Sequence, residues 1–192
     1  MKEKLLIIGA GGFGRSLSEL ARENYECFFL DDNADKNQII CQTKVIGKIK
    51  DINVLYPEFT NLIVAIGNNS LREKIYLEAK TIGYHFPNIL GRNVYISPFS
   101  TVGEGCVFHN NVTIQNGAHV GNGVILNPNV EIHIDGSVDD FSLIYSNSVI
   151  RTYAKVAKRV RIGSNVTISN NAIVDCDSDI KDGSVISKER SM

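Results

Sequence analysis

The second half of the chain repeats every six residues. From position 90 to position 186, each sixth residue is aliphatic, with Phe108 as the single exception, and the register holds through sixteen hexads. The residue four places after each of these positions is small or short in its side chain. Chance does not plausibly produce this pattern, so it predicts a repeat architecture. The series is Leu90, Ile96, Val102, Phe108, Ile114, Val120, Leu126, Ile132, Val138, Ile144, Ile150, Val156, Ile162, Ile168, Val174, Ile180 and Ile186.

A period of six fits neither an α-helix nor a simple alternating strand. It predicts a solenoid in which each coil has three short flat faces and each face is one hexad. The large aliphatic side chain fills the interior, and the small one allows the chain to turn nearby. Successive coils stack at about 4.8 Å, the usual spacing between strands. Gly, Asn and Asp are frequent at the intervening positions, where tight turns need a tolerant backbone. Such a prism buries one continuous apolar column.

The first half of the chain alternates between strand and helix patterns. Residues 15–24 carry apolar side chains at helical spacing, and Ser70 with Glu73 forms a capping-box pattern that predicts a second helix. Alternation of this kind predicts a parallel sheet with flanking helices. We therefore expect a Rossmann-like α/β domain at 1–85 and a β-helix domain at 86–192. Three short apolar runs, typical of buried parallel strands, lie at residues 5–8, 27–30 and 62–66.

Composition excludes several classes of function. The net charge is -1 and the chain lacks a long Lys/Arg run, which argues against a nucleic-acid partner. The four cysteines are far apart and form no C-x-x-C pair, so we expect reduced thiols and no metal. The apolar run before Gly9 is too short for a signal peptide or a membrane span. These features favour a cytoplasmic protein.

A glycine-rich loop joins the first strand to the first helix. Its sequence is Gly9-Ala10-Gly11-Gly12-Phe13-Gly14, and Asp31 and Asp32 follow at the end of the next strand. This is the context of a dinucleotide-binding fingerprint, in which backbone N–H groups meet a phosphate at a helix N-terminus. A tight turn without a ligand is the alternative. NAD is not favoured, because the domain is about half the length of a full two-unit dinucleotide fold.

Taken together, these motifs resemble the left-handed β-helix acyltransferases, and more narrowly the sialic acid O-acetyltransferase and UDP-amino-sugar N-acetyltransferase branch. The residues that carry the resemblance are the loop 9–14, Leu30-Asp31-Asp32, Ala65-Ile66-Gly67-Asn68-Asn69-Ser70-Leu71-Arg72 and Ile125-Leu126-Asn127. The resemblance implies a left-handed helix and a homotrimer. It also implies transfer of an acyl group from acetyl-CoA, bound between neighbouring helices, to an amine or hydroxyl of a sugar that is often nucleotide-linked.

The resemblance also implies which residues bind each substrate. The UDP part of a nucleotide-sugar acceptor is expected at the glycine loop, at the end of the second strand and at the turn after the third. Acyl-CoA is expected along the later coils, near a basic cluster formed by Arg151, Lys155, Lys158, Arg159 and Arg161. The expected acceptor residues are Gly9, Gly11, Gly12, Phe13, Gly14, Asp31, Asp32, Gly67, Asn68, Asn69 and Arg72. The expected donor residues are Asn147, Ser148, Lys155, Asn171 and Ala172.

The catalytic hexad departs from the family pattern. Forming an amide or ester from a thioester needs a base that takes a proton from the acceptor. In the resembling family this base is a histidine, and the matching position here is Ile134. His133 stands one place earlier and Asp135 one place later, so we expect His133 to act as the base with Asp135 as its orienting acid. A second family histidine corresponds to Leu143.

The remaining histidines are weaker candidates. His109 and His119 are expected to be surface residues or to line a cleft between subunits, and His85 is expected in the junction between domains. The family usually ends in a Gly-x-Pro-Ala-[Lys/Arg] segment that covers the CoA site. The corresponding end of this chain, 187–192, has no such sequence, so we expect weaker or different CoA binding.

Three hypotheses remain from the sequence. The first is an acyltransferase for a nucleotide-linked sugar in glycan or surface-polysaccharide synthesis. The second is a non-catalytic or catalytically altered β-helix protein that binds a nucleotide sugar or a protein partner, which the absent histidines favour. The third is a nicotinamide-dependent oxidoreductase, which the glycine loop alone suggests and the hexads argue against.

Overall fold

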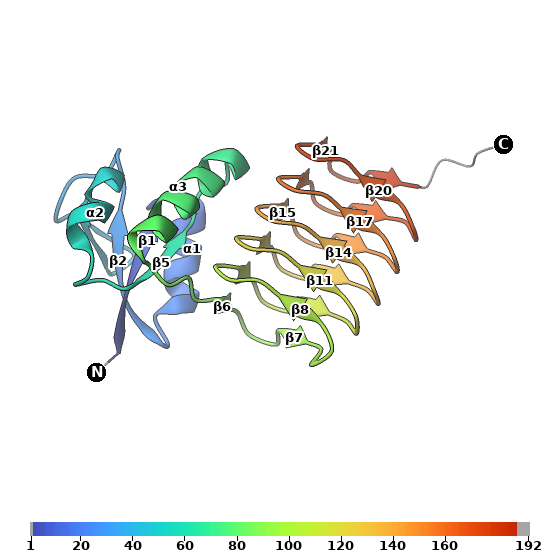
Figure 1. Cartoon of the computed structure of the whole chain (residues 1–192), viewed down its shortest axis with the longest axis horizontal. Coiled ribbons are helices and arrows are strands. Elements are labelled where there is room, and N and C mark those ends of the chain that lie inside the picture. The colour runs from blue at the N-terminus through green and yellow to red at the C-terminus, as the bar shows by residue number, and fades with distance from the viewer. Residues whose placement is uncertain (1, 188–192) are drawn as a thin grey trace. The chain divides into compact units, whose positions relative to one another are not determined.

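The computed structural model describes residues 2–187 and shows two compact units, Met1–Ile89 and Leu90–Met192 (Figure 1). The first unit is an α/β domain and the second is a coil of short strands. The observed division falls four residues after the predicted boundary at residue 85. The predicted fold class, an α/β domain followed by a left-handed parallel β-helix, is confirmed.

The first unit is built on a five-stranded sheet of order β3-β4-β2-β1-β5. Strands β4, β2, β1 and β5 run parallel, as the alternating pattern predicted, and β3 is an antiparallel edge strand. The four residues at the end of β1 are completely buried, which explains their continuous apolar run. The elements are β1 (Glu3–Ile8), α1 (Gly12–Ala21), β2 (Tyr25–Leu30), β3 (Ile39–Ile40), β4 (Thr43–Gly47), η1 (Ile49–Asp51), α2 (Ile52–Leu55), β5 (Asn61–Val64) and α3 (Asn69–Ile82).

Local differences from the sequence prediction are confined to element ends and to one segment. The predicted cap at Ser70 is wrong, because α3 begins earlier and its N-cap is Asn68, whose side-chain oxygen accepts a hydrogen bond from Leu71 N. Between β2 and β5 the sequence predicted no element. The structure places β3, β4, η1 and α2 there, all of five residues or fewer. Elements this short do not present a clear period.

The second unit winds through three parallel sheets. Figure 1 shows β8, β11, β14, β17 and β20 of one sheet stacked along the coil. Each strand has two residues and pairs with the strand eighteen residues away. The strands are β6 (Ile89–Leu90), β7 (Tyr95–Ile96), β8 (Thr101–Val102), β9 (Val107–Phe108), β10 (Thr113–Ile114), β11 (His119–Val120), β12 (Ile125–Leu126), β13 (Glu131–Ile132), β14 (Ser137–Val138), β15 (Leu143–Ile144), β16 (Val149–Ile150), β17 (Lys155–Val156), β18 (Arg161–Ile162), β19 (Thr167–Ile168), β20 (Ile173–Val174), β21 (Asp179–Ile180) and β22 (Val185–Ile186).

Two side chains of each hexad enter the interior of the coil. From β7 onward the second residue of each strand packs inside, and the short residue two places before it generally does so as well, as with Val130 and Ile132. Leu90, the first residue of the predicted series, is instead 46 % exposed. The short side chain is therefore part of the core, beyond the role in turning that the sequence suggested. A large and a small side chain alternate around each coil, which fills a narrow prism at the density of a protein interior.

Nearly every turn between strands passes through a left-handed backbone conformation, the turn at Phe99 being an exception. Positive φ angles recur at six-residue intervals, at Gly or Asn in most coils but also at Phe141, Tyr153 and Arg159. One corner carries a ladder of asparagines in which each side chain bonds the next coil, from Asn93 through Asn111, Asn129 and Asn147 to Asn165. Asparagine tolerates positive φ and supplies both a donor and an acceptor, so the ladder keeps the coils in register.

The interior column predicts different responses from adjacent residues of β19. Ile168 is completely buried and Thr167 is partly exposed. We expect Ile168→Ala to lower the free energy of unfolding by about 2–5 kcal/mol, because it leaves a cavity in the column. Thr167→Ala, the matched control, should change it by less than about 1 kcal/mol. Urea unfolding measures both, and equal losses would contradict the register.

Candidate nucleotide and active sites

In the first unit, two loops meet at one edge of the sheet. Strands β1 and β5 are neighbours and parallel, so the loops that follow them lie at the same edge. The chain passes from β1 to β2 on one side and returns to β5 on the other, which makes this edge a topological switch point. Open α/β sheets bind ligands at such points. The glycine loop and the Gly67-Asn68-Asn69 turn are thus brought together, as the sequence predicted.

Glycines in these loops have two different roles. A side chain on Gly14 would collide with the carbonyl oxygen of Gly9, and one on Gly67 would come within 2.9 Å of the Phe13 ring. These glycines allow close packing. Gly11 and Gly12 are exposed, and a Cβ on either would meet nothing within 4 Å. Their backbone at the start of α1 is therefore open to a ligand. Gly11 is the N-cap of this helix, and it has no side chain to accept a hydrogen bond from the N–H groups there.

Asp31 anchors the glycine loop. Its carboxylate accepts hydrogen bonds from Ala10 N at 2.7 Å, from Asn33 N at 2.7 Å and from Ala34 N at 3.1 Å. Burial acts to raise the pKa of this carboxyl, but the three N–H groups and the charge of Lys48 outweigh it, so the pKa of Asp31 lies below its usual value. Asp31 is engaged in the fold, and its neighbour Asp32 accepts a hydrogen bond from Ile49 N.

Arg72 holds the turn that follows β5 in place. It is 1 % exposed, and its guanidinium donates to Ile66 O at 2.7 Å and to Asn69 Oδ1 at 2.8 Å. Asn68 caps α3. The polar side chains expected to contact the acceptor therefore hold the two loops in shape, while the glycine backbone remains accessible. A buried, fully hydrogen-bonded arginine fixes a turn because leaving any of its donors unpaired is costly.

In the second unit, His133 stands on the outer surface of the third coil. It directly follows β13, whose second residue, Ile132, is completely buried. His133 Nε2 lies 3.2 Å from Glu131 Oε2, and the two side chains are 28 % and 48 % exposed. Residues two apart on an extended chain point to the same side. That spacing is the signal by which Glu131 was identifiable in the sequence, although our sequence analysis did not single it out.

The other residues singled out around the expected catalytic position do not pair with His133. Asp135 adopts positive φ at the corner, and its carboxylate lies over Gly117 of the preceding coil. The structure gives it no hydrogen bond to His133. Ile134, in the family's histidine position, is 47 % exposed, whereas Leu143 is buried. The imidazole is therefore paired with the acid that precedes it.

The residues expected to hold acyl-CoA differ in how accessible they are. Asn147 belongs to the asparagine ladder, and the hydroxyl of Ser148 is buried between Gly163 O and Val166 N. Ala172 faces the interior. Lys155 and Asn171 have exposed positions on the coil. Of the five expected residues, Lys155 and Asn171 thus present to solvent side chains that take no part in the hydrogen bonds between coils.

The predicted basic cluster is partly neutralised. Arg159 forms two hydrogen bonds with Asp177, at 2.6 and 2.7 Å, and Arg161 bonds Asp179 at 2.7 Å. The Arg159 guanidinium lowers the pKa of Asp177. These pairs link one coil to the next. Lys155 remains exposed within the cluster.

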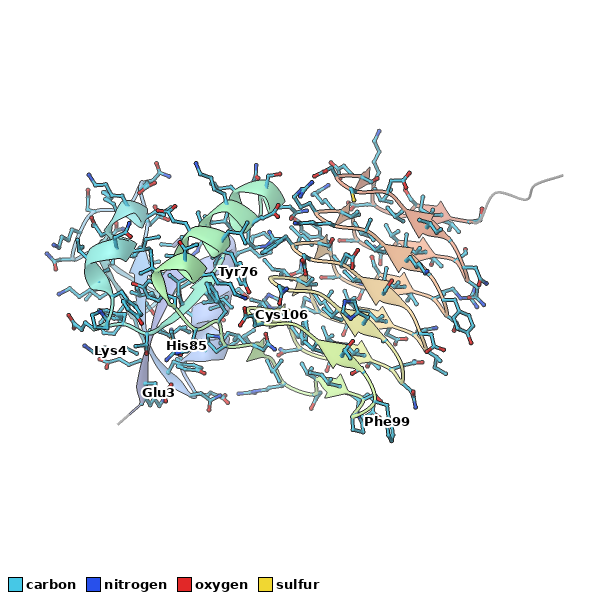
Figure 2. The ribbon with its side chains drawn as sticks, in the orientation of Figure 1. Glu3, Lys4, Tyr76, His85, Phe99 and Cys106 are labelled. Carbon is cyan, nitrogen blue, oxygen red and sulfur yellow. The ribbon has the colours of Figure 1, made fainter. Side chains whose placement is uncertain are left out.

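The remaining histidines have separate surroundings. His119 is exposed, and its Nδ1 lies 2.7 Å from Thr101 Oγ1. His85, which is labelled in Figure 2, extends the first sheet through a bridge to Asn61. His109 is buried, which lowers its pKa. Among the residues that the structure describes, none of these three histidines has an acidic partner such as the one that His133 has.

Among residues 2–187, no group of three His, Cys, Asp or Glu side chains is placed to hold a metal ion. Over the same residues, no helix has both the length and the apolar character needed to cross a bilayer. The predicted C-terminal departure falls mainly at residues 188–192, outside the described part of the chain.

The anchoring role of Asp31 predicts a loss of stability when the carboxylate is removed. Asp31→Ala leaves three backbone N–H groups without their acceptor, so we expect a loss of about 1–3 kcal/mol at neutral pH. Because the folded carboxyl is the stronger acid, its contribution is present above the unfolded pKa near about 3.9 and disappears as pH falls through the folded value. Denaturant unfolding at neutral and acidic pH measures this difference. The control is Asp35→Ala, which removes an exposed acid from the segment between β2 and β3 that also contains Asp31.

Comparison with known proteins identifies the family. The model of the PglD N-terminal domain matches residues 4–79. The acetyltransferase domain of PglB from Neisseria gonorrhoeae FA1090, in complex with acetyl coenzyme A, is 32 % identical to this chain. The match covers 96 % of both chains with a TM-score of 0.71.

Two more distant structures share the fold alone. A mutant perosamine N-acetyltransferase from Caulobacter crescentus, in complex with CoA and GDP-perosamine, is 20 % identical over 97 % of both chains with a TM-score of 0.59. WeeI from Acinetobacter baumannii AYE is 16 % identical over 98 % of both chains with a TM-score of 0.71. The near-complete match at 32 % identity establishes that this chain belongs to the hexapeptide-repeat β-helix acetyltransferases that carry a PglD-type N-terminal domain.

Proposed function

We propose that this chain transfers an acetyl group from acetyl-CoA to an amine or hydroxyl of a nucleotide-linked sugar, with His133 as the base. The observation that carries the proposal is a partly exposed, acid-paired imidazole on the third coil of a chain that matches an acetyltransferase domain over nearly its whole length. That relative was crystallised with acetyl coenzyme A. A base within reach of the acceptor is the group that this reaction needs most.

The proposed reaction forms one bond between heavy atoms and breaks one, and it moves one proton from the acceptor to the CoA sulfur. The acceptor nitrogen or oxygen attacks the thioester carbonyl carbon while His133 takes the proton from it. The bond between the carbonyl carbon and sulfur then breaks, and the CoA thiolate leaves. The proton on the imidazole passes to that sulfur, so the enzyme returns to its starting state with CoA and the acylated sugar as products.

The first unit is proposed to hold the nucleotide part of the acceptor. The accessible backbone at Gly11 and Gly12 opens α1, where N–H groups and the helix dipole favour a phosphate. Asp31 and Arg72 act by holding the two loops open and in shape. Asp32, Gly67 and Asn69 complete the same edge. In this proposal the glycine backbone binds the nucleotide, and the side chains of Asp31 and Arg72 keep the two loops in position.

For the donor, we propose contacts from Lys155 and Asn171, whose side chains are exposed. Lys155 offers a cation to a CoA phosphate. Asn147, Ser148 and Ala172 contribute through the shape of the coil surface, since their side chains are engaged or buried. The Arg159 and Arg161 pairs shape this end of the coil and leave fewer free cations than the sequence suggested.

We also propose a homotrimer. Large apolar side chains are exposed along the corner that follows His133 in its coil and along the same corner of other coils: Phe99 is 73 %, Tyr153 53 % and Ile134 47 % exposed. Figure 2 shows Phe99 standing out from the edge of its coil. Exposed apolar groups along one corner are typical of a surface that another copy covers. Sedimentation equilibrium should give three times the chain mass of 21.2 kDa, and a single-chain mass would contradict the proposal.

The alternative is a catalytically altered protein that binds a nucleotide sugar without transferring an acyl group. Ile134 and Leu143 favour it, because they stand where the family has histidines. A UDP-sugar that raises the melting temperature, without release of CoA from acetyl-CoA in its presence, would support this alternative. A rise with NAD alone would instead favour the oxidoreductase hypothesis.

The test of the proposed base is the His133→Ala variant. We expect the rate of CoA release from acetyl-CoA, with a panel of UDP- and GDP-linked amino sugars, to fall by about 10²–10⁴-fold, because the acceptor proton loses its base. Release of the thiol is followed by a colorimetric thiol reagent.

The control for this test is His119→Ala, which removes an exposed histidine from another face of the coil. It should retain the wild-type rate. Full activity in His133→Ala would show that the base lies elsewhere and would remove this role from the proposal.

A further inference from the structure

The acid that faces His133 precedes it in the chain. Glu131 is the first residue of β13 and His133 follows the second, so both project outward while Ile132 between them is buried in the column. Backbone pairing holds this row on both sides, since His133 N donates to Ile150 O of the following coil and Gln115 N of the preceding coil donates to Ile132 O. The approach of carboxylate to imidazole is therefore fixed by the register of the coil.

The contact is made through a specific ring nitrogen. Glu131 Oε2 lies 3.2 Å from Nε2, which leaves Nδ1 directed away from the carboxylate. An ionised carboxylate accepts hydrogen bonds only, so the pair favours the tautomer that has its proton on Nε2. In that tautomer Nδ1 carries the free lone pair. A base needs such a lone pair and a fixed ring orientation.

We infer that Glu131 is a positioning residue for His133, holding the ring with Nδ1 free to accept the proton and stabilising the imidazolium that forms. The inference rests on the proposed function of His133. Glu131 takes the role that the sequence suggested for Asp135, because the carboxylate of Asp135 lies against Gly117 of the preceding coil. The acid and the base are both displaced toward the strand relative to the family position at Ile134.

The same geometry defines the charges that act on the ring. Glu131 and Asp135 belong to its own coil. Arg151 holds the equivalent position one coil later, and the uncharged Gln115 holds it one coil earlier. Glu131 is the charged group that the structure places within hydrogen-bonding distance. Removing its charge should therefore have a larger effect on proton uptake by His133 than removing any other charge in the row.

The test compares Glu131→Gln with a matched loss of charge. Asp139→Asn is the control, because Asp139 is exposed in the next hexad of the same coil. We expect Glu131→Gln to lower kcat by about 10- to 100-fold with little change in the KM for acetyl-CoA. A purely structural role would instead raise the KM together with the loss of kcat, and Glu131→Asp would not restore kcat.

The possible outcomes separate the two proposals. Partial recovery of kcat in Glu131→Asp, with wild-type behaviour in Asp139→Asn, supports the positioning role. An unchanged kcat in Glu131→Gln, or a loss of kcat produced by Asp135→Asn instead, overturns it. If His133→Ala is inactive while Glu131→Gln behaves as wild type, the positioning role fails and the base remains. If His133→Ala is fully active, the base itself is wrong.

Discussion

The stacked interior column of the coil determines almost everything else in the second unit. One aliphatic and one short side chain from each hexad pack inside, and the backbone of every coil bonds the next. Because this packing fixes which residues point inward, it also fixes which point outward. A slip of one residue would exchange the two faces of every strand. The position of any surface group is therefore as well defined as the core beneath it.

That constraint gives meaning to the displaced histidine. A shift from Ile134 to His133 moves the imidazole from the corner to the flat face beside β13. There its neighbour in space becomes Glu131 rather than Asp135. The acid that the family pattern places next to its histidine is unavailable, because Asp135 lies over Gly117. The coil thus pairs this imidazole with a different acid, the last residue of the preceding hexad, without any change in its register.

Much of this architecture could be predicted from the sequence, and the limits have physical causes. The hexads and the apolar runs report buried faces, and they predicted both units. The segment between β2 and β5 was missed because its elements are too short to show a period. The structural roles of Asp31, Arg72 and Asn147 could not be predicted, for a different reason. Their side chains bond backbone groups or neighbouring coils, contacts that depend on residues distant in the sequence.

We propose that acetyl transfer takes place at the outward row of Glu131 and His133. A crystal structure of the protein with bound acetyl-CoA tests this placement. We expect the thioester carbonyl to lie beside this row, with room for one acceptor atom within about 2.6–3.2 Å of His133 Nδ1. A thioester bound at another face, or beside a different base, would contradict it.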